Sequence, residues 1–285
     1  MAGNQRKNKD AILNYGSDYQ KEMAGKYRNR NSNHWKLRIE LARDLVEKYV
    51  LPKYQGRPKK DIVLLDIGCS IGTFAIEFSK LGYRSYGIDF DSSALDIAKQ
   101  LSDEEGVTPE FICGDVSKWD KDLPPVDIAI CFDIFEHLHD DELGSLLASI
   151  RSRFSGKGAL VFHTFPTQYD YIFYYKRYLS YPILLFKNLP RSVFDRIVKA
   201  YSSILDALLL LKTGKTYKEM IGHDSHCNPT TGERLTEILK RAGYEVVFLE
   251  SSNLYKNGSH VQKRLRKQPI AFRNIYGVAI PKSKT

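Results

Sequence analysis

Cysteine and long apolar runs are both scarce in this 285-residue chain, and each shortage excludes a class of protein. The four cysteines, Cys69, Cys113, Cys131 and Cys227, have neither disulfide nor metal-site spacing, so they predict buried thiols in a reducing compartment. No stretch reaches the roughly 18 apolar residues that a membrane-spanning helix needs. Residues 1–10 are polar and basic and lack the apolar centre of a secretory signal. We therefore expect a soluble cytoplasmic protein.

Acidic residues are outnumbered by basic ones, 34 against 43, which gives a net charge of +9. Basic residues gather before residue 31 and again at 263–267. Such an excess favours acidic partners, such as nucleic acid, anionic lipid headgroups or phosphorylated substrates. Solvated surface charge explains the same excess, so contact with RNA or with the surface of a membrane is an alternative that stays open.

The most informative motif, residues 61–74, lacks the third glycine of a dinucleotide site. An apolar, β-branched strand ends at Asp66, and a turn that contains Gly68 and Gly72 then opens a helix. Glycines let the backbone approach a nucleotide-like ligand closely, and the helix N-terminus lies beside that ligand. Because the pattern is D-x-G-x-x-x-G rather than G-x-G-x-x-G, it indicates a cationic or zwitterionic ligand rather than a diphosphate.

Two further acids end the next two predicted strands. Asp89 ends the strand over 84–89, about 20 residues past the glycine turn, where a carboxylate can hold ribose hydroxyls. Asp91 instead suits the N-cap of the next helix. Asp115 follows a third short strand over 110–114. The three acids occur in the order and spacing of a nucleoside-binding α/β protein.

Together these motifs resemble the class I S-adenosylmethionine (SAM)-dependent methyltransferases, whose first motif reads (D/E)-x-G-x-G-x-G. Ser70 stands in place of the middle glycine. The resemblance covers roughly residues 35–165 and 228–282. It implies SAM as cofactor and an α/β fold: a seven-stranded, Rossmann-like, mostly parallel sheet with an antiparallel last strand. The cofactor-binding residues that it implies are Asp66, Gly68, Cys69, Gly72, Asp89, Phe90, Asp115, Val116 and Phe132.

Four regions are expected along the chain. They are a flexible basic N-terminus (1–33), the SAM-binding core (34–167), a Tyr-rich helical insertion (168–222) and a C-terminal part of the core with a basic loop (223–285). Six tyrosines lie between Tyr169 and Tyr181, and an amphipathic helix is predicted over 191–212. The insertion would form a lid over the ligand, pack as an extra helical layer, or touch a membrane surface.

Candidates for the chemistry follow the fourth predicted strand, in residues 133–140. The pair Glu136–His137 resembles the E-H signature of the ubiquinone-biosynthesis type of O-methyltransferase, a branch that acts on small molecules. A histidine can remove the proton of an acceptor hydroxyl, so His137 is the predicted base and Glu136 the group that orients it. Both residues could instead simply cap the next helix, and for His139 that interpretation is preferred. Enzymes that methylate amino groups of adenine or glutamine carry the tetrapeptide Asn-Pro-Pro-Tyr after this strand. Its absence here argues against N-methylation of nucleobases.

A second histidine pair, at 223 and 226, leaves a metal-dependent alternative open. Together with this pair, Asp133-x-x-Glu136-His137 resembles the motif E-x-x-E-H plus a distal histidine of the metal-dependent small-RNA 2′-O-methyltransferases. Asp133 stands where that motif has its first glutamate. The corresponding ligand set would be Asp133, Glu136, His137 and His226; the preferred hypothesis uses no metal.

That hypothesis is O-methylation of a small-molecule, glycan or lipid-like acceptor by a protein that can also lie peripherally on a membrane. The rivals are a metal-assisted RNA 2′-O-methyltransferase and a non-catalytic SAM-binding partner subunit, which would not need the Glu-His pair.

Overall fold

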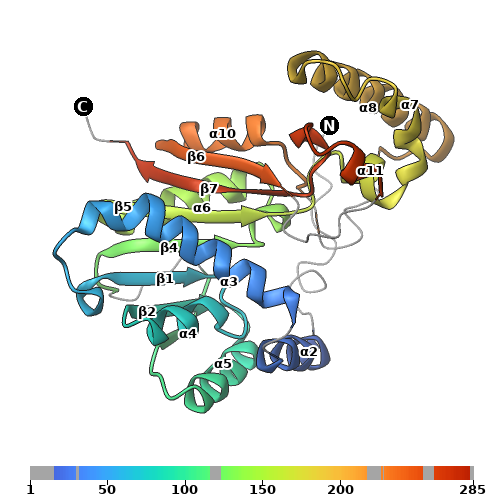
Figure 1. Cartoon of the computed structure of the whole chain (residues 1–285). Coiled ribbons are helices and arrows are strands. Elements are labelled where there is room, and N and C mark those ends of the chain that lie inside the picture. Colours follow the sequence, from blue (N-terminus) through green and yellow to red (C-terminus); the bar gives the residue numbers. More distant parts are fainter. Residues whose placement is uncertain are drawn as a thin grey trace. The chain divides into compact units, whose positions relative to one another are not determined.

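A central seven-stranded sheet organises the chain, seen here in a computed structural model that describes residues 16–29, 32–115, 123–216, 226, 228–252 and 260–282. The strand order is β3-β2-β1-β4-β5-β7-β6 (Figure 1). The strands β1 to β4 pair in parallel where their registers are defined, and β6 pairs antiparallel with β7. The predicted fold class is therefore confirmed. The strands are β1 (Val63–Ile67), β2 (Arg84–Asp89), β3 (Glu110–Cys113), β4 (Val126–Phe132), β5 (Phe154–Thr164), β6 (Tyr244–Ser252) and β7 (Asn274–Pro281).

Helices and short helical turns connect these strands. The α-helices are α2 (Gly16–Arg28), α3 (Asn33–Leu45), α4 (Thr73–Lys80), α5 (Ser92–Glu104), α6 (Asp140–Arg153), α7 (Tyr181–Leu184), α8 (Arg191–Thr213), α10 (Gly232–Arg241) and α11 (His260–Arg264). The π- and 3₁₀-turns are η1 (Val46–Val50), η2 (Leu51–Tyr54), η3 (Lys59–Asp61), η4 (Phe135–His137), η5 (Tyr171–Tyr175), η6 (Arg177–Ser180) and η7 (Pro269–Ala271). Among the described residues, no helix is long and apolar enough to cross a bilayer.

The chain forms two compact units. The first contains residues 1–131 and 148–161, and the second contains residues 132–147 and 162–285. In the first unit, α4 contacts β1 and β2 while α5 contacts β2 and β3 (Figure 1). The apolar side chains of α5 at residues 94, 95, 98 and 101 are all buried. Asp91 caps α5 by accepting hydrogen bonds from the backbone N–H groups of Ser93 and Ala94, as predicted.

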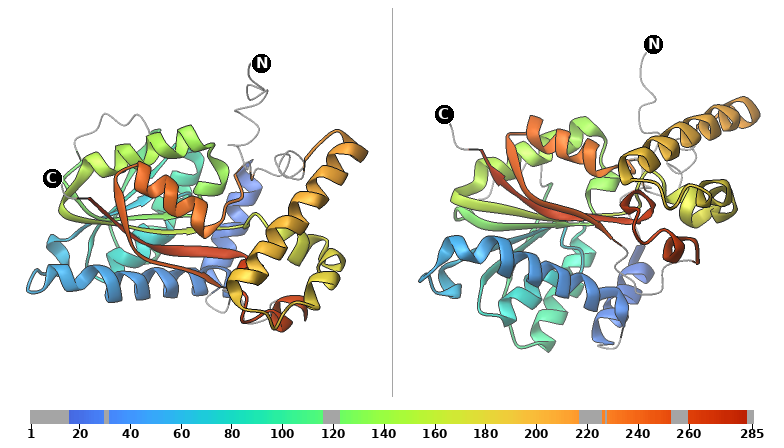
Figure 2. Two further views of the ribbon diagram at one scale, coloured as in Figure 1. Left: turned by 90° about the horizontal axis from the view of Figure 1, so that it is seen from above. Right: turned by 45° about the horizontal axis from the view of Figure 1, so that its top comes forward.

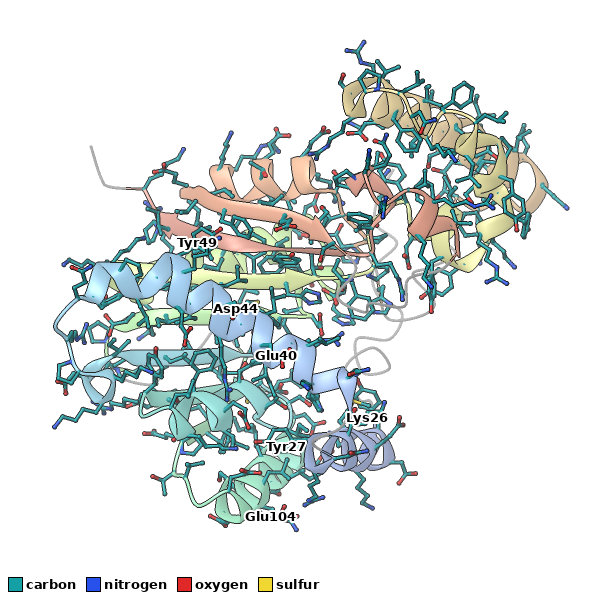
Figure 3. The ribbon with its side chains drawn as sticks, viewed as in Figure 1. Lys26, Tyr27, Glu40, Asp44, Tyr49 and Glu104 are labelled. Atoms are coloured by element: carbon teal, nitrogen blue, oxygen red, sulfur yellow. The ribbon has the colours of Figure 1, made fainter. Side chains whose placement is uncertain are left out.

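Residues 16–28 correct the expectation of a flexible N-terminus, because they form α2 and pack within the first unit. Tyr27 is buried, and its hydroxyl donates to Glu77 Oε1 on α4 at 2.8 Å. Arg28 makes a two-pronged ion pair with Glu104 of α5, at 2.8 and 2.7 Å. Figure 3 labels Tyr27 on α2 and Glu104 at the end of α5. The side chains of Gln20, Met23 and Tyr27 recur at helical spacing and are buried, which the sequence alone could have indicated.

The Tyr-rich insertion is helical, as predicted, and it has a buried apolar cluster of its own. This cluster also takes in Val261, Leu265 and Ala271, which the sequence had assigned to the C-terminal part of the core. The segment expected to be a basic loop is therefore partly the short helix α11, with apolar side chains directed into the cluster. The members of the cluster are Tyr169, Ile172, Phe173, Ile183, Phe194, Val198, Val261, Leu265 and Ala271. The role of the insertion as a lid stays a prediction.

Arg273 explains part of the tyrosine content. Its guanidinium makes a two-pronged ion pair with buried Asp170, with Nε–Oδ1 at 2.9 Å and Nη2–Oδ2 at 3.1 Å. The same group lies 3.6 Å from the ring centroid of Tyr174 and 6.0 Å from that of Tyr175. Aromatic rings around a guanidinium are attracted by its charge, so these two tyrosines fasten the insertion to the segment before β7.

Candidate active site

The glycine turn after β1 adopts left-handed backbone conformations at three positions. The φ angles are 63° at Gly68, 47° at Ser70 and 77° at Gly72. A Cβ atom at Gly72 would lie 2.7 Å from the ring of Phe111 and 2.9 Å from Cβ of Ala98. Gly72 is therefore required twice, by its backbone angle and by the side chains of β3 and α5 that pass it. Ser70 shows that the middle glycine of the motif can be replaced even where φ is positive.

Asp66 is buried in β1 and faces the first turn of α4. Its Oδ2 accepts a hydrogen bond from the N–H of Ala75 at 3.1 Å, which satisfies one of the free amides at the start of that helix. Burial raises the pKa of Asp66 to about 8. The structure thus assigns this acid a role in joining strand, turn and helix.

Asp89, the last residue of β2, accepts hydrogen bonds from the glycine turn and from the residue that caps α5. Its Oδ2 accepts from the N–H of Ser70 at 2.8 Å and its Oδ1 accepts from the N–H of Asp91 at 3.0 Å. Burial raises the pKa of this carboxyl. Each carboxylate oxygen has a second lone pair, so Asp89 can accept further hydrogen bonds from a pair of hydroxyls. A rigid acceptor pair beside a glycine turn fits the ribose of SAM.

The other residues predicted to hold the cofactor differ in how exposed they are and in what they contact. Phe90 is 48% exposed directly after Asp89, where an aromatic ring is available to a purine. The thiol of Cys69 is buried, and its backbone N–H donates to the carbonyl of Ile88 at 3.0 Å, so this residue shapes the turn. Asp115 is exposed after β3. Val116 lies outside the described residues. The last residue of β4, Phe132, is buried with its ring centroid 5.3 Å from that of His163.

In the second unit, the loop after β4 begins with the half-buried acid Asp133, from which a hydrogen-bonded relay runs through His163 to Asn274. The sequence did not reveal this relay. Asp133 has a φ of 58°, and its Oδ1 lies 2.5 Å from Nδ1 of His163. The other ring nitrogen of His163 lies 2.9 Å from Oδ1 of Asn274. The imidazole is inaccessible to solvent, so His163 positions Asp133 rather than touching a substrate. A polar residue at the end of an otherwise apolar strand, as His163 is, was the available signal.

Glu136, His137 and His226 come together in the same unit. Glu136 is buried, and its Oε2 accepts a hydrogen bond from Thr164 Oγ1 at 2.7 Å. Its other oxygen lies 4.0 Å from Nε2 of His137, whose side chain is 18% exposed. The rings of His137 and His226 stack with centroids 5.0 Å apart. The loop is fastened by Asn228, whose N–H donates to the carbonyl of Glu136 at 2.8 Å.

One potential ligand atom from each of these three residues lies within 4.8 Å of the others, so the cluster could hold a metal ion. Three of the four residues of the ligand set expected for the metal-dependent alternative are thus grouped. Asp133, the fourth, lies outside this group and is bonded to His163. His223 is outside the described residues. His139 has the capping role that was preferred for it, because its carbonyl accepts from Leu143 while its N–H donates to Glu142.

Comparisons with known proteins agree with this geometry. The chain matches the model of a family described as a methyltransferase domain over residues 34–249. It is 29% identical over 79 residues to a ubiquinone biosynthesis O-methyltransferase of Coxiella burnetii, a match that covers 28% of this chain and only 34% of that relative. The chain thus spans about a third of the length of that curated relative.

Two solved structures share the fold. One is the 1,6-didemethyltoxoflavin N1-methyltransferase of Burkholderia thailandensis with bound S-adenosylhomocysteine, at a TM-score of 0.53 and 16% identity over 96% of this chain and 88% of that one. The other is the magnesium protoporphyrin IX methyltransferase of Synechocystis, also with bound S-adenosylhomocysteine, at a TM-score of 0.50 and 15% identity over 87% and 84%. The family match extends over more than half of the chain and contains the glycine turn, both buried acids and the Glu-His loop. The chain therefore belongs to the methyltransferase-domain family.

Proposed function

We propose that the chain transfers the methyl group of SAM to a hydroxyl oxygen of a small-molecule, glycan or lipid-like acceptor, with His137 as the general base. The observation that carries this proposal is the Glu136–His137 pair in the second unit. A buried carboxylate held by Thr164 lies 4.0 Å from an imidazole that solvent can still reach. A base needs both an orienting partner and access to the acceptor, and His137 has both.

The chemistry divides simply between cofactor and protein. SAM, when bound, supplies an electrophilic methyl group, so the protein has to align the acceptor and remove its proton. The proton of the hydroxyl would pass to a ring nitrogen of His137. The negative charge of Glu136 would stabilise the imidazolium that forms, and the stacked ring of His226 would limit rotation of His137.

The cofactor would be bound by the glycine turn and Asp89. In this proposal Asp89 accepts hydrogen bonds from the ribose hydroxyls, Phe90 and Asp115 flank the adenine, and Gly68 and Gly72 admit the methionine part. The parallel pairing of β1 supports this assignment. β1 and β4 pair in parallel, and in such sheets ligands bind at the carboxyl ends of the strands, which is where the glycine turn begins.

The second candidate is a metal-assisted 2′-O-methyltransferase of RNA, favoured by the convergence of Glu136, His137 and His226. One carboxylate and two imidazoles suit a borderline divalent cation such as Zn²⁺ or Mn²⁺, which would lower the pKa of a bound hydroxyl. The non-catalytic alternative is less favoured, because a subunit that only binds SAM has no need for this arrangement.

His137→Ala tests the proposal against both alternatives. Phenolic, lipid-extract and RNA acceptors would be offered in turn. With the acceptor that the wild type methylates, the variant should form S-adenosylhomocysteine at a rate lower by a factor on the order of 10²–10⁴. Its affinity for SAM, measured by titration calorimetry, should be nearly normal. His139→Ala is the matched control, since His139 contributes its backbone to the cap of α6 and should keep full turnover.

Each outcome separates the hypotheses. Full loss of wild-type activity in EDTA with recovery on adding Zn²⁺ or Mn²⁺ would favour the metal-assisted reaction. RNA binding that weakens steeply with salt would point to an RNA acceptor. A His137→Ala enzyme that is as active as wild type and indifferent to EDTA would remove this residue from the mechanism.

A further inference from the structure

Helix α8 has two apolar faces, and only one of them is buried. Phe194 and Val198 pack into the cluster of the insertion, with Tyr201 and Leu205 against it. This face is the one that an amphipathic helix needs for folding. The second face lies beside the first, about 100° around the helix by the helical repeat, and consists of Val193, Ala200, Ile204, Leu208 and Leu211, which we call the α8 stripe.

Every member of the α8 stripe is exposed. The exposed fractions are 58% at Ile204, 56% at Leu208 and 84% at Leu211. The stripe runs about 27 Å along the helix, at 1.5 Å per residue. In both views of Figure 2, the last turns of α8 extend past α7 and α11 of the same unit. Large aliphatic side chains at such exposure indicate an interaction surface, because isolated exposure is ordinary but a continuous row is not.

Positive charge accompanies the α8 stripe. Residues 174–215 contain eight of the 43 basic residues of the chain but only two of its 34 acidic ones, so this segment carries most of the net charge of +9. One acid, Asp195, lies 3.7 Å from Arg191. Seven of these eight basic residues are exposed. The eighth, Lys199, is half-buried and makes an ion pair with Glu233. The eight are Lys176, Arg177, Lys187, Arg191, Arg196, Lys199, Lys212 and Lys215.

The cations stand at both ends of the stripe. Lys187 and Arg191 precede its first residue, and Lys212 and Lys215 follow its last. By the helical repeat, Arg196 lies beside the stripe, between the levels of Val193 and Ala200 along the helix. Four exposed tyrosines, Tyr174, Tyr175, Tyr178 and Tyr181, belong to the same segment. Basic residues around an apolar row, with tyrosines near, are the composition of helices that lie in the headgroup layer of a membrane.

We infer that the α8 stripe docks this protein on the surface of an anionic lipid bilayer, with α8 parallel to the plane of the membrane. The aliphatic side chains would enter the outer edge of the acyl region, and the flanking Lys and Arg would contact acidic headgroups. No helix in the described part of the chain could span the bilayer, so the contact would be peripheral.

Charge complementarity selects this occupant over two others. RNA would neutralise the cations, yet its phosphates gain nothing from Ile204, Leu208 or Leu211. A second copy of the chain would bring the same positive segment against itself, and a single row of side chains is narrow beside the roughly 800 Å² per partner of a stable interface. An anionic membrane satisfies both the apolar row and the charge.

Flotation of the full chain with lipid vesicles tests the inference without any assay of methyl transfer. The wild type should float with phosphatidylcholine–phosphatidylglycerol vesicles at low salt, less at high salt, and hardly with phosphatidylcholine alone. Leu208→Ser/Leu211→Ser should weaken binding by roughly tenfold or more, and Lys212→Glu/Lys215→Glu should weaken it and reduce its salt dependence.

Matched controls lie on other exposed elements. Val247→Ser on β6 removes an exposed apolar side chain, and Lys240→Glu/Arg241→Glu on α10 reverses two exposed charges, and both should bind as wild type does. Circular dichroism melting should be unchanged in the Leu208→Ser/Leu211→Ser protein, since the side chains are exposed.

Three results would overturn the inference. One is failure of the wild type to float with anionic vesicles at low salt, and another is undiminished binding by the Leu208→Ser/Leu211→Ser protein. The third is a dimer, seen by sedimentation without lipid, that the same two substitutions dissolve, because the stripe would then be an interface between copies.

Discussion

Asp66 and Asp89 at the glycine turn and Glu136 after β4 are buried, and Asp133 is half-buried, but the two pairs of acids are held by different kinds of donor. Asp66 and Asp89 accept hydrogen bonds from backbone N–H groups a few residues away or on the adjoining turn. Asp133 and Glu136 are instead held by side chains, those of His163 and Thr164. Backbone donors follow from the path of the chain, whereas side-chain donors must be supplied residue by residue. The first site therefore depends on conformation, and the second on the identity of distant residues.

Of the substitutions considered, replacement of Gly72 in the glycine turn should lower the free energy of unfolding most. Gly72→Ala forces an alanine to a φ of 77° and places its Cβ 2.7 Å from the Phe111 ring. Left-handed strain and overpacking should together lower the free energy of unfolding by about 3 kcal/mol or more. Urea denaturation followed by circular dichroism would measure it.

Gly82→Ala is the matched control for that prediction. Gly82 has a φ of 89°, and a Cβ there would meet nothing within 4 Å. Only the strain of about 1–2 kcal/mol should remain. Equal losses in the two variants would show that the packing on Phe111 is unimportant.

The glycine turn could be predicted from the sequence because its signal is local. The strand, the two glycines and the acids at 66 and 89 lie within the 27 consecutive residues 63–89, and the structure confirms the strand-turn-helix context that the motif requires. The relay around His163 could not be predicted in the same way, because Asn274 is 111 residues further along the chain. Which distant side chain reaches a buried imidazole is decided by strand order and register, and neither can be read from residue type.

The same contrast explains the error at the N-terminus. α2 is short and polar on average, so its buried face of Met23, Ala24 and Tyr27 was overlooked beside its charges. In the insertion, the number of tyrosines could be read from the sequence, but the position of two of them around Arg273 could not. The exposed apolar row lies on α8, where the predicted amphipathic helix has a second face that periodicity could not identify as exposed.

His163→Leu should break the second arrangement with an intermediate effect. The substitution removes the imidazole between Asp133 and Asn274 and leaves the amide oxygen of Asn274 without that donor. A buried polar group that loses its partner costs about 2 kcal/mol, which thermal or urea unfolding would measure. In His163→Leu/Asn274→Leu both partners are apolar, so the loss should be smaller than the sum of the two single losses. Strict additivity would mean that the two side chains are not coupled.

Asp66→Asn would sharpen the comparison through the pH dependence of stability. Burial raises the pKa of Asp66 to about 8, whereas an unfolded aspartate ionises near pH 4. Between these values the folded chain binds the additional proton, so this group makes stability fall as pH rises from about 4 to about 8. An asparagine keeps an oxygen that can accept from Ala75 but does not titrate. The free energy of unfolding should therefore decline less between pH 5 and pH 8 in Asp66→Asn than in the wild type, while exposed Asp96→Asn on α5 should follow the wild-type slope. An unchanged slope in Asp66→Asn would mean that the carboxylate is already charged at neutral pH, held by the amides at the start of α4 more strongly than burial disfavours it.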